Sequence, residues 1–209
     1  MGERSLDGAI AVRIPYERPY RYDLLVDFLR FRAIKGVEVV DESGRYARTC
    51  AIGDDTGWIT VENDDAASEI ALCVSASLAA HADDLARRTR LLFDTDCDPS
   101  SVSAALADFH ARVDGRYRIE GVRLPCSFEP FEMSVRAILG QQITVKAANT
   151  LAGRVADEFG VPCEVPVPGL SCVFPSAPAF LGDDVPERLG RLGVIGRRAQ
   201  AICLLARSL

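Results

Sequence analysis

The sequence predicts an α+β protein, in which an antiparallel sheet with two helices is followed by an all-α half. Two observations carry this prediction. Alternating apolar runs separated by short turns fill the first half, whereas apolar residues at helical spacing fill the second. We place the change of character near residue 113, which predicts one domain over residues 1–113 and another over residues 114–209.

The first half contains five apolar runs that favour β-strands. They are expected at residues 8–16, 37–40, 46–52, 58–61 and 69–75. The turns between the later runs are short, which favours antiparallel neighbours. Helices are expected at residues 22–33 and about 82–93. We expect the aromatic residues of the first helix other than Phe28 to lie in the core. The apolar residues that follow a helical period in this helix are Leu24, Leu25, Phe28, Leu29 and Phe31.

The strand pattern ends after Asp98-Pro99, a pair that favours a helix start because proline suits the first helical turn. Helices are expected at residues 100–112, 129–140, 143–159, 185–192 and 196–208. Residues 160–178 contain five prolines and could be a flexible linker. Because the apolar Cys172-Val-Phe174 lies in its middle, we expect an ordered loop anchored to a core.

Composition places the chain among ordinary globular proteins, with 48% hydrophobic and 26% charged residues in 209. No run of 18 apolar residues is present, so no membrane partner is expected. The first residues lack an apolar signal core, and we expect a cytoplasmic protein. The net charge of -6 argues against nucleic acid, but the acidic excess is confined to one half. Residues 1–115 carry 13 basic and 21 acidic side chains, and residues 116–209 carry 11 and 9.

Seven cysteines are scattered along the chain and never spaced as C-x-x-C. Only His81 and His110 are available to join them. Buried free thiols are therefore a better interpretation than a zinc site, and neither a metal nor another cofactor is expected.

The most informative motif is the break at Gly140-Gln141-Gln142 between two apolar helices. Two adjacent long amides follow a glycine, where a buried loop would favour small or capping residues. A glutamine side chain at a protruding turn can donate and accept hydrogen bonds and can enter between stacked bases. The motif is typical of a wedge that holds a gap open in a duplex.

These residues belong to a series of short landmarks that runs along nearly the whole chain. Because of these landmarks and their order, the chain resembles the 3-methyladenine DNA glycosylase II family of helix-hairpin-helix base-excision glycosylases. The landmarks are Pro19-Tyr20, Phe28-Leu-Arg-Phe-Arg-Ala33, Tyr46-Ala-Arg48, Arg90-Leu-Leu-Phe-Asp94, Cys97-Asp-Pro99, Arg123-Leu-Pro125, Phe131, Val135-Arg-Ala-Ile-Leu-Gly-Gln-Gln142, Phe174-Pro175 and Leu192-Gly193.

The resemblance implies a sheet domain similar to the TATA-binding protein repeat, followed by an incomplete helix-hairpin-helix glycosylase domain. It implies a monomeric DNA-repair hydrolase that flips alkylated bases out of double-stranded DNA and breaks the N-glycosidic bond. In such a reaction a carboxylate stabilises the developing positive charge on the sugar. A positively charged base can be selected by an electron-rich aromatic pocket.

The resemblance also assigns roles to particular positions. The wedge falls on Gln142, and the residues that shape its turn are Gln141, Ile143 and Thr144. Phe28 corresponds to an aromatic residue that lines the base pocket, although a core position is an equal alternative. The alternative to a wedge is that Gln142 has a purely structural role in the turn. Arg197 and Arg198 open the last helix, where they could contact phosphate or form a solvated pair.

No helix-hairpin-helix turn occurs before Leu209, and the family's catalytic aspartate lies beyond that element. We therefore expect this chain to be inactive alone and to lack a catalytic residue. The aspartates that could substitute favour helix capping instead; they are Asp94, Asp96, Asp98, Asp183 and Asp184. The unfinished helical half is expected to expose apolar surface at Ile202, Leu204, Leu205 and Leu209.

Two further hypotheses compete with a glycosylase. One is a non-catalytic module that distorts DNA or regulates, using the same wedge without base chemistry. The other is a protein-interaction platform on the antiparallel sheet, which would fit the acidic first half.

Overall fold

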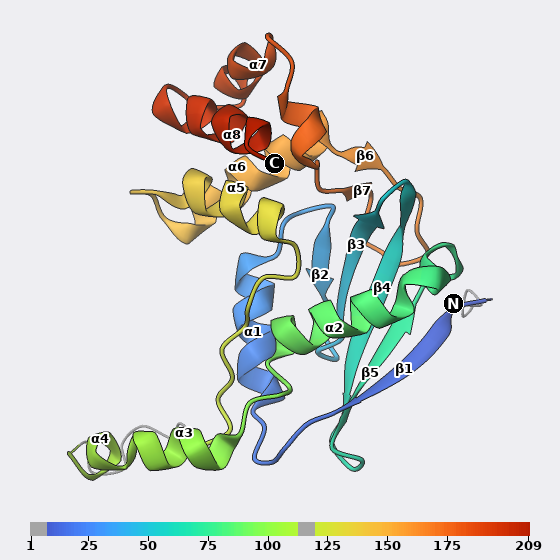
Figure 1. Cartoon of the computed structure of the whole chain (residues 1–209), viewed down its shortest axis with the longest axis vertical. Helices are drawn as coiled ribbons and strands as arrows, with labels where there is room; N and C mark the ends of the chain where they lie inside the picture. Colours follow the sequence, from blue (N-terminus) through green and yellow to red (C-terminus); the bar gives the residue numbers. More distant parts are fainter. Residues whose placement is uncertain (1–7, 113–119) are drawn as a thin grey trace.

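The computed structural model describes residues 8–112 and 120–209. Its two parts lie side by side, a sheet covered on one face by two helices and a helical part beyond the sheet's β2 edge (Figure 1). Each part has its own hydrophobic cluster. The structure thus has the expected α+β architecture.

The five strands form one antiparallel sheet in the order β1-β5-β4-β3-β2. They are β1 (Ile10–Pro15), β2 (Glu38–Val40), β3 (Tyr46–Ile52), β4 (Asp55–Asp64) and β5 (Glu69–Val74). The fourth strand is longer than expected, because Asp55 already pairs with Ile52 across a tight turn. Alternate residues such as Ile14, Ile59 and Leu72 face the covering helices and are almost fully buried.

Two helices cover that face, α1 (Tyr22–Arg32) and α2 (Ala82–Phe93), the latter preceded by the short η1 (Ala76–His81). In α1 only one side is buried, through Leu25 and Leu29. Phe31 is 61% exposed, so the expectation that it lies in the core was wrong. Phe31 lies seven residues after Leu24 and three residues after Phe28. The three side chains therefore share one face of the helix, which is turned away from the sheet.

The expected helix at residues 100–112 is two short helices, α3 (Pro99–Ala105) and α4 (Ala107–Arg112), interrupted at Leu106. Its start is as predicted, since the Asp98 carboxylate accepts a hydrogen bond from the N–H of Ser100 at 2.8 Å. These helices project away from both cores (Figure 1). Short helices without a packed face gain little stability from tertiary contacts, which accounts for the break.

The helical part contains α5 (Pro130–Gly140), α6 (Val145–Phe159), α7 (Val185–Arg191) and α8 (Arg197–Arg207), with a short η2 (Ala177–Phe180). Phe180 and Ile202 are fully buried at its centre. The expectation that Ile202 would be exposed was therefore wrong, because α8 packs that side chain into the core of the helical part. Leu204 and Leu209 are exposed as expected, and Leu205 is partly buried.

The proline-rich segment after α6 is an ordered loop, as predicted. Its strands β6 (Val161–Pro162) and β7 (Cys172–Val173) pair with each other, and Leu170 bridges to Gly36. The Thr49 hydroxyl donates a hydrogen bond to the carbonyl of Cys172 at 2.6 Å. The loop therefore fastens the helical part to the uncovered face of the sheet, where Thr49 is fully buried. None of the helices in the described ranges is long and apolar enough to cross a bilayer.

Candidate nucleic-acid interface

The turn between α5 and α6 is short and strained. Helix α5 ends at Gly140, and Thr144 caps α6 by accepting a hydrogen bond from the N–H of Ala147 at 3.2 Å. Gln142, between them, has a φ of 55°, in the left-handed region. That conformation costs an ordinary residue roughly 1–2 kcal/mol. The surrounding fold therefore holds Gln142 in a position that its own backbone does not favour.

The side chains of this turn point in two directions. Gln141 and Gln142 are exposed, while Ile143 is partly buried and lines a neighbouring cleft. Helix α8 supports the turn from behind, since the guanidinium of Arg198 donates a hydrogen bond to the carbonyl of Gln141. Arg197, the preceding residue, is exposed. The structure thus presents two amides to solvent from a braced support.

Beside the turn lies a cleft of about 360 Å³ between α1, α5 and the start of α6. Phe28 lines it from α1 and is 39% exposed. The Arg32 guanidinium lies 3.8 Å from the centroid of the Phe28 ring, within cation–π distance. Phe28 and Ile143 line the same cleft, so the structure brings the aromatic residue and the Gln142 turn together.

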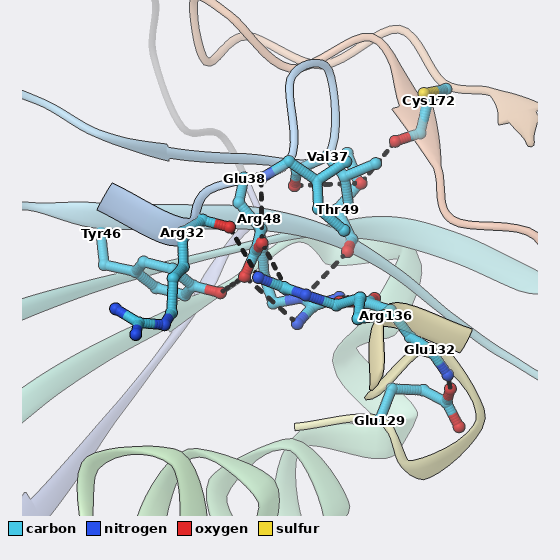
Figure 2. Close-up of polar contacts among 11 residues, drawn as sticks. Arg32, Val37, Glu38, Tyr46, Arg48, Thr49, Glu129, Glu132, Arg136 and Cys172 are labelled. Carbon is cyan, nitrogen blue, oxygen red and sulfur yellow. Dashed lines mark hydrogen bonds and ion pairs between the residues drawn. The ribbon is translucent and has the colours of Figure 1, made fainter. Parts of the chain in front are cut away.

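The floor of the cleft is a buried ionic network (Figure 2). The Arg48 guanidinium contacts Glu132 at 2.6 Å, and the Arg136 guanidinium contacts Glu38 at 2.9 Å and Glu132 at 3.2 Å. The Tyr46 hydroxyl donates to Glu38 at 2.8 Å. Glu38, Arg48 and Glu132 are each less than a tenth exposed. Charges from β2, β3 and α5 therefore meet at the junction of the sheet and the helical part.

Burial alone would raise the pKa of Glu38. The facing guanidinium groups of Arg136 and Arg48, with the Tyr46 hydroxyl, outweigh it and hold the pKa of Glu38 below its ordinary value. Glu38 is accordingly a carboxylate in the folded protein. Arg136 also donates to the carbonyl of Arg32 at 2.6 Å, which ties the end of α1 to α5.

Residues 11–129, more than half of the chain, match the family described as the AlkA N-terminal domain. The chain belongs to this family. It is 35% identical over 191 residues to DNA-3-methyladenine glycosylase 2 of Escherichia coli (strain K12), which covers 91% of this chain and 64% of that protein. The resemblance to the 3-methyladenine DNA glycosylase II family is thereby confirmed. The chain spans less than two thirds of that relative.

Solved structures show the same fold. A 3-methyladenine DNA-glycosylase from Archaeoglobus fulgidus superposes with a TM-score of 0.77 at 20% identity, covering 94% of this chain and 66% of that one. An 8-oxoguanine glycosylase/lyase from Clostridium acetobutylicum, in complex with double-stranded DNA, gives a TM-score of 0.57 at 15% identity, covering 82% and 54%. The AlkA-like architecture predicted from the sequence is therefore confirmed.

The ionic network was not predicted from the sequence, although its two arginines, Arg48 and Arg136, lie within the landmarks named above. A usable signal was present in β3, where Arg48 shares a strand face with Tyr46 and Cys50, both of which are buried. A charge at a core-facing position of an alternating strand indicates a buried partner. The partner itself, Glu132, is far away in the sequence and could not be named.

The three carboxylates that line this cleft all make contacts within the protein. Glu38 and Glu132 belong to the ionic network, and Glu129 accepts a hydrogen bond from the N–H of Glu132 at 2.6 Å. A carboxylate whose charge is matched by buried guanidinium groups is not available to stabilise charge on a substrate sugar. The cleft thus offers an aromatic wall and a polar floor, and among the described residues its only lining carboxylate without an ion pair is Glu129, which caps α5.

The aspartates considered from the sequence have structural or surface positions. Asp98 caps α3, and Asp94 accepts a hydrogen bond from the N–H of Leu124 at 3.0 Å. Asp184 occupies the N-cap position of α7 but makes no capping hydrogen bond through its side chain, in contrast to the expected role. The exposed members of the set are Asp96, Asp98, Asp183 and Asp184.

All seven cysteines are free thiols, but only Cys50, Cys172 and Cys203 are buried, so the expectation of burial was wrong for the other four, of which Cys126 is exposed. Within residues 8–112 and 120–209, no group of three or more His, Cys, Asp or Glu side chains has the geometry to hold a metal ion. Cys50, a residue of β3, is buried, and burial raises the pKa of its thiol to about 11. Of the two histidines, His81 contacts Asp55 at 2.9 Å, and the side chain of His110 lies outside the described positions.

Proposed function

We propose that this chain contributes the strand-opening part of a DNA-repair glycosylase activity of the 3-methyladenine II class, directed at alkylated bases in double-stranded DNA. The exposed, strained Gln142 turn beside a cleft lined by Phe28 carries the proposal. A base rotated out of the duplex needs both a group that fills its place and a pocket that receives it. Family membership supports the same conclusion.

In this proposal Gln142 enters the space left by the flipped nucleotide, and its amide hydrogen-bonds the orphaned base. Ile143 and Thr144 hold the turn, and Gln141 lies beside the wedge. Phe28 stacks against the flipped base, with preference for one that carries positive charge. In the same proposal the exposed Arg197 contacts a phosphate, whereas Arg198 holds the turn through its hydrogen bond to the carbonyl of Gln141.

A second function, a module that distorts DNA without base chemistry, is favoured by one observation. Every carboxylate that lines the cleft is engaged in an ion pair or a hydrogen bond. We propose accordingly that the 209-residue chain opens DNA but does not release bases. The interaction-platform hypothesis loses part of its surface, because the loop at residues 160–178 covers the sheet face around Thr49.

Binding to duplexes with and without an abasic analogue tests the proposal. We expect tighter binding to the abasic duplex, because no base has to be unstacked, and loss of this preference in Gln142→Ala. The matched control is Gln200→Ala, an exposed glutamine on α8. Equal affinity for both duplexes in the unmodified chain would rule out the wedge.

Release of methylated bases from DNA separates the two functions. We expect no release above a buffer control from the 209-residue chain, while the abasic preference is retained. Measurable turnover would show that an acid within this chain acts on the sugar, which would overturn the assignment of the cleft carboxylates to structural roles.

A further inference from the structure

A second hollow lies against the neighbouring side of α1. We call it the α1–α6 groove; it has a volume of about 780 Å³, and its walls are the last turns of α1, the segment up to Lys35, and one face of α6. Asn149 lines both this groove and the cleft, so the two hollows share a wall. None of the roles assigned above uses the α1–α6 groove.

The chain contains only two lysines, Lys35 and Lys146, and both line this groove. Both are exposed, and neither forms an ion pair within the part of the chain that the structure describes. All other basic side chains, apart from the two histidines, are arginines. A lysine ammonium is a compact charge on a flexible stem, which suits contact with a single phosphate. Two such charges, remote in sequence, therefore converge on one hollow.

Phe31 supplies an aromatic surface in the same groove. At 61% exposure it is the most exposed aromatic ring in the described residues, and it belongs to neither core cluster. The Asn149 side chain donates a hydrogen bond to the Phe31 carbonyl at 2.8 Å, which fixes the backbone beneath the ring. An exposed ring beside unpaired cations is the arrangement on which proteins stack bases of single-stranded nucleic acid.

The remaining charges in the groove are largely engaged. Arg30 is paired with Asp27, and Arg154 donates to the carbonyl of Leu192 at 3.0 Å. Asp157 lies three turns along α6 from Lys146, at the opposite end of the helix face. Lys146 lies at the start of α6, and the Cβ of Lys35 lies beside Gly153, two turns further along the same helix, so the two lysines flank the first turns of α6.

The groove also begins close to the Gln142 turn. Lys146 is the second residue of α6, four residues beyond Gln142. A DNA strand that is held at the turn can therefore continue toward the groove.

We propose that the α1–α6 groove binds one nucleotide of single-stranded DNA, with the base against the Phe31 ring and a phosphate between Lys35 and Lys146. This proposal rests on the proposed function only in one respect, that the ligand is DNA. An acidic peptide could satisfy the two lysines, but it would leave the exposed ring without a stacking partner.

Amine-reactive labelling tests this site directly, because Lys35 and Lys146 are the only lysines. The probe is a short oligothymidine, with the N-terminal amine as the internal reference. We expect the oligonucleotide to slow modification of both lysines at least several-fold relative to the reference. No protection of either lysine, or equal protection by an oligoglutamate peptide, would overturn the proposal.

Substitutions provide the second arm. Phe31→Ala should weaken oligothymidine binding by about tenfold, because stacking on an aromatic ring is lost. Its control is Leu24→Ala, because Leu24 is also an exposed apolar residue of α1 but lines neither the cleft nor the groove. Equal affinities for the two variants would contradict the site.

The lysines are tested by Lys35→Gln and Lys146→Gln, with Arg207→Gln at the end of α8 as the control. Each lysine substitution should reduce the slope of log affinity against log salt by about 0.7, and the control should leave it unchanged. An unchanged slope in both lysine variants would also contradict the site. Gln142→Ala separates this proposal from the first, because it should abolish the abasic preference and retain lysine protection.

Discussion

The turn beside the cleft and the floor of the cleft are built on opposite principles. At the turn, which we call the mouth, Gln142 is exposed and held in a left-handed conformation that costs stability. At the floor, Arg48 and Glu132 are almost completely buried and 2.6 Å apart. The mouth gives up stability for an amide that faces solvent, whereas the floor uses buried charge to fix how the sheet and the helical part meet.

The difference teaches where substitutions should be silent and where they should be severe. A group that acts on DNA can be replaced without loss of the fold, because it makes few contacts within the protein. A group that joins the two parts cannot be replaced alone, because its partner is left charged and buried. Stability and DNA binding should therefore respond to different residues.

The largest expected effect is at the floor. Arg48→Met leaves Glu38 and Glu132 facing one fewer cation, and we expect it to lower the free energy of unfolding by about 3–5 kcal/mol. Denaturant unfolding measures the change. The control is Glu187→Ala, which removes a solvent-exposed pair with Arg191 and should cost no more than about 1 kcal/mol. Equal losses in the two variants would contradict the distinction between floor and surface.

The next effect is a dependence of stability on pH. The pKa of Glu38 is held below its ordinary value of 4.5 in the folded protein. Its contribution to stability is therefore complete above that value and is lost as the pH falls through the lowered pKa. We expect the stability of the unmodified chain to fall more steeply below about pH 5 than that of Glu38→Gln. Parallel pH profiles of the two unfolding free energies would show that Glu38 is not stabilised as an anion.

The smallest effect is at the mouth and has the opposite sign. Glycine adopts a positive φ without steric cost, so Gln142→Gly should raise the free energy of unfolding by up to about 1 kcal/mol. The same substitution should remove the preference for abasic duplex. Thermal unfolding and duplex binding measure the two changes. A Gln142→Gly variant that is less stable than the unmodified chain and keeps the preference for abasic duplex would contradict this account of the turn.

Local patterns predicted those features that depend on neighbouring residues. Alternation located the strands, Asp98-Pro99 marked a helix start, and the two long amides indicated an exposed turn at Gln142. The apolar Cys172-Val-Phe174 indicated an anchored loop, which is what the structure contains. In each case the signal lies within a few residues of the feature.

Features that depend on distant partners were not predictable in this way. The helical period of α1 showed that it has an apolar face, but not that Phe31 lies outside the contact with the sheet. The pairing of Arg48 with Glu132 joins residues on different elements and leaves no local pattern. The burial of Ile202 likewise depends on how α8 packs against the rest of the helical part.

The central claim is that the Gln142 turn opens a duplex and directs a base toward the Phe28 cleft. Fluorescence of 2-aminopurine in a duplex tests it most directly, because its emission rises when the base leaves the stack. We expect the unmodified chain to raise the emission and Gln142→Ala to leave it near that of free DNA. Bound duplex with unchanged emission would contradict the account.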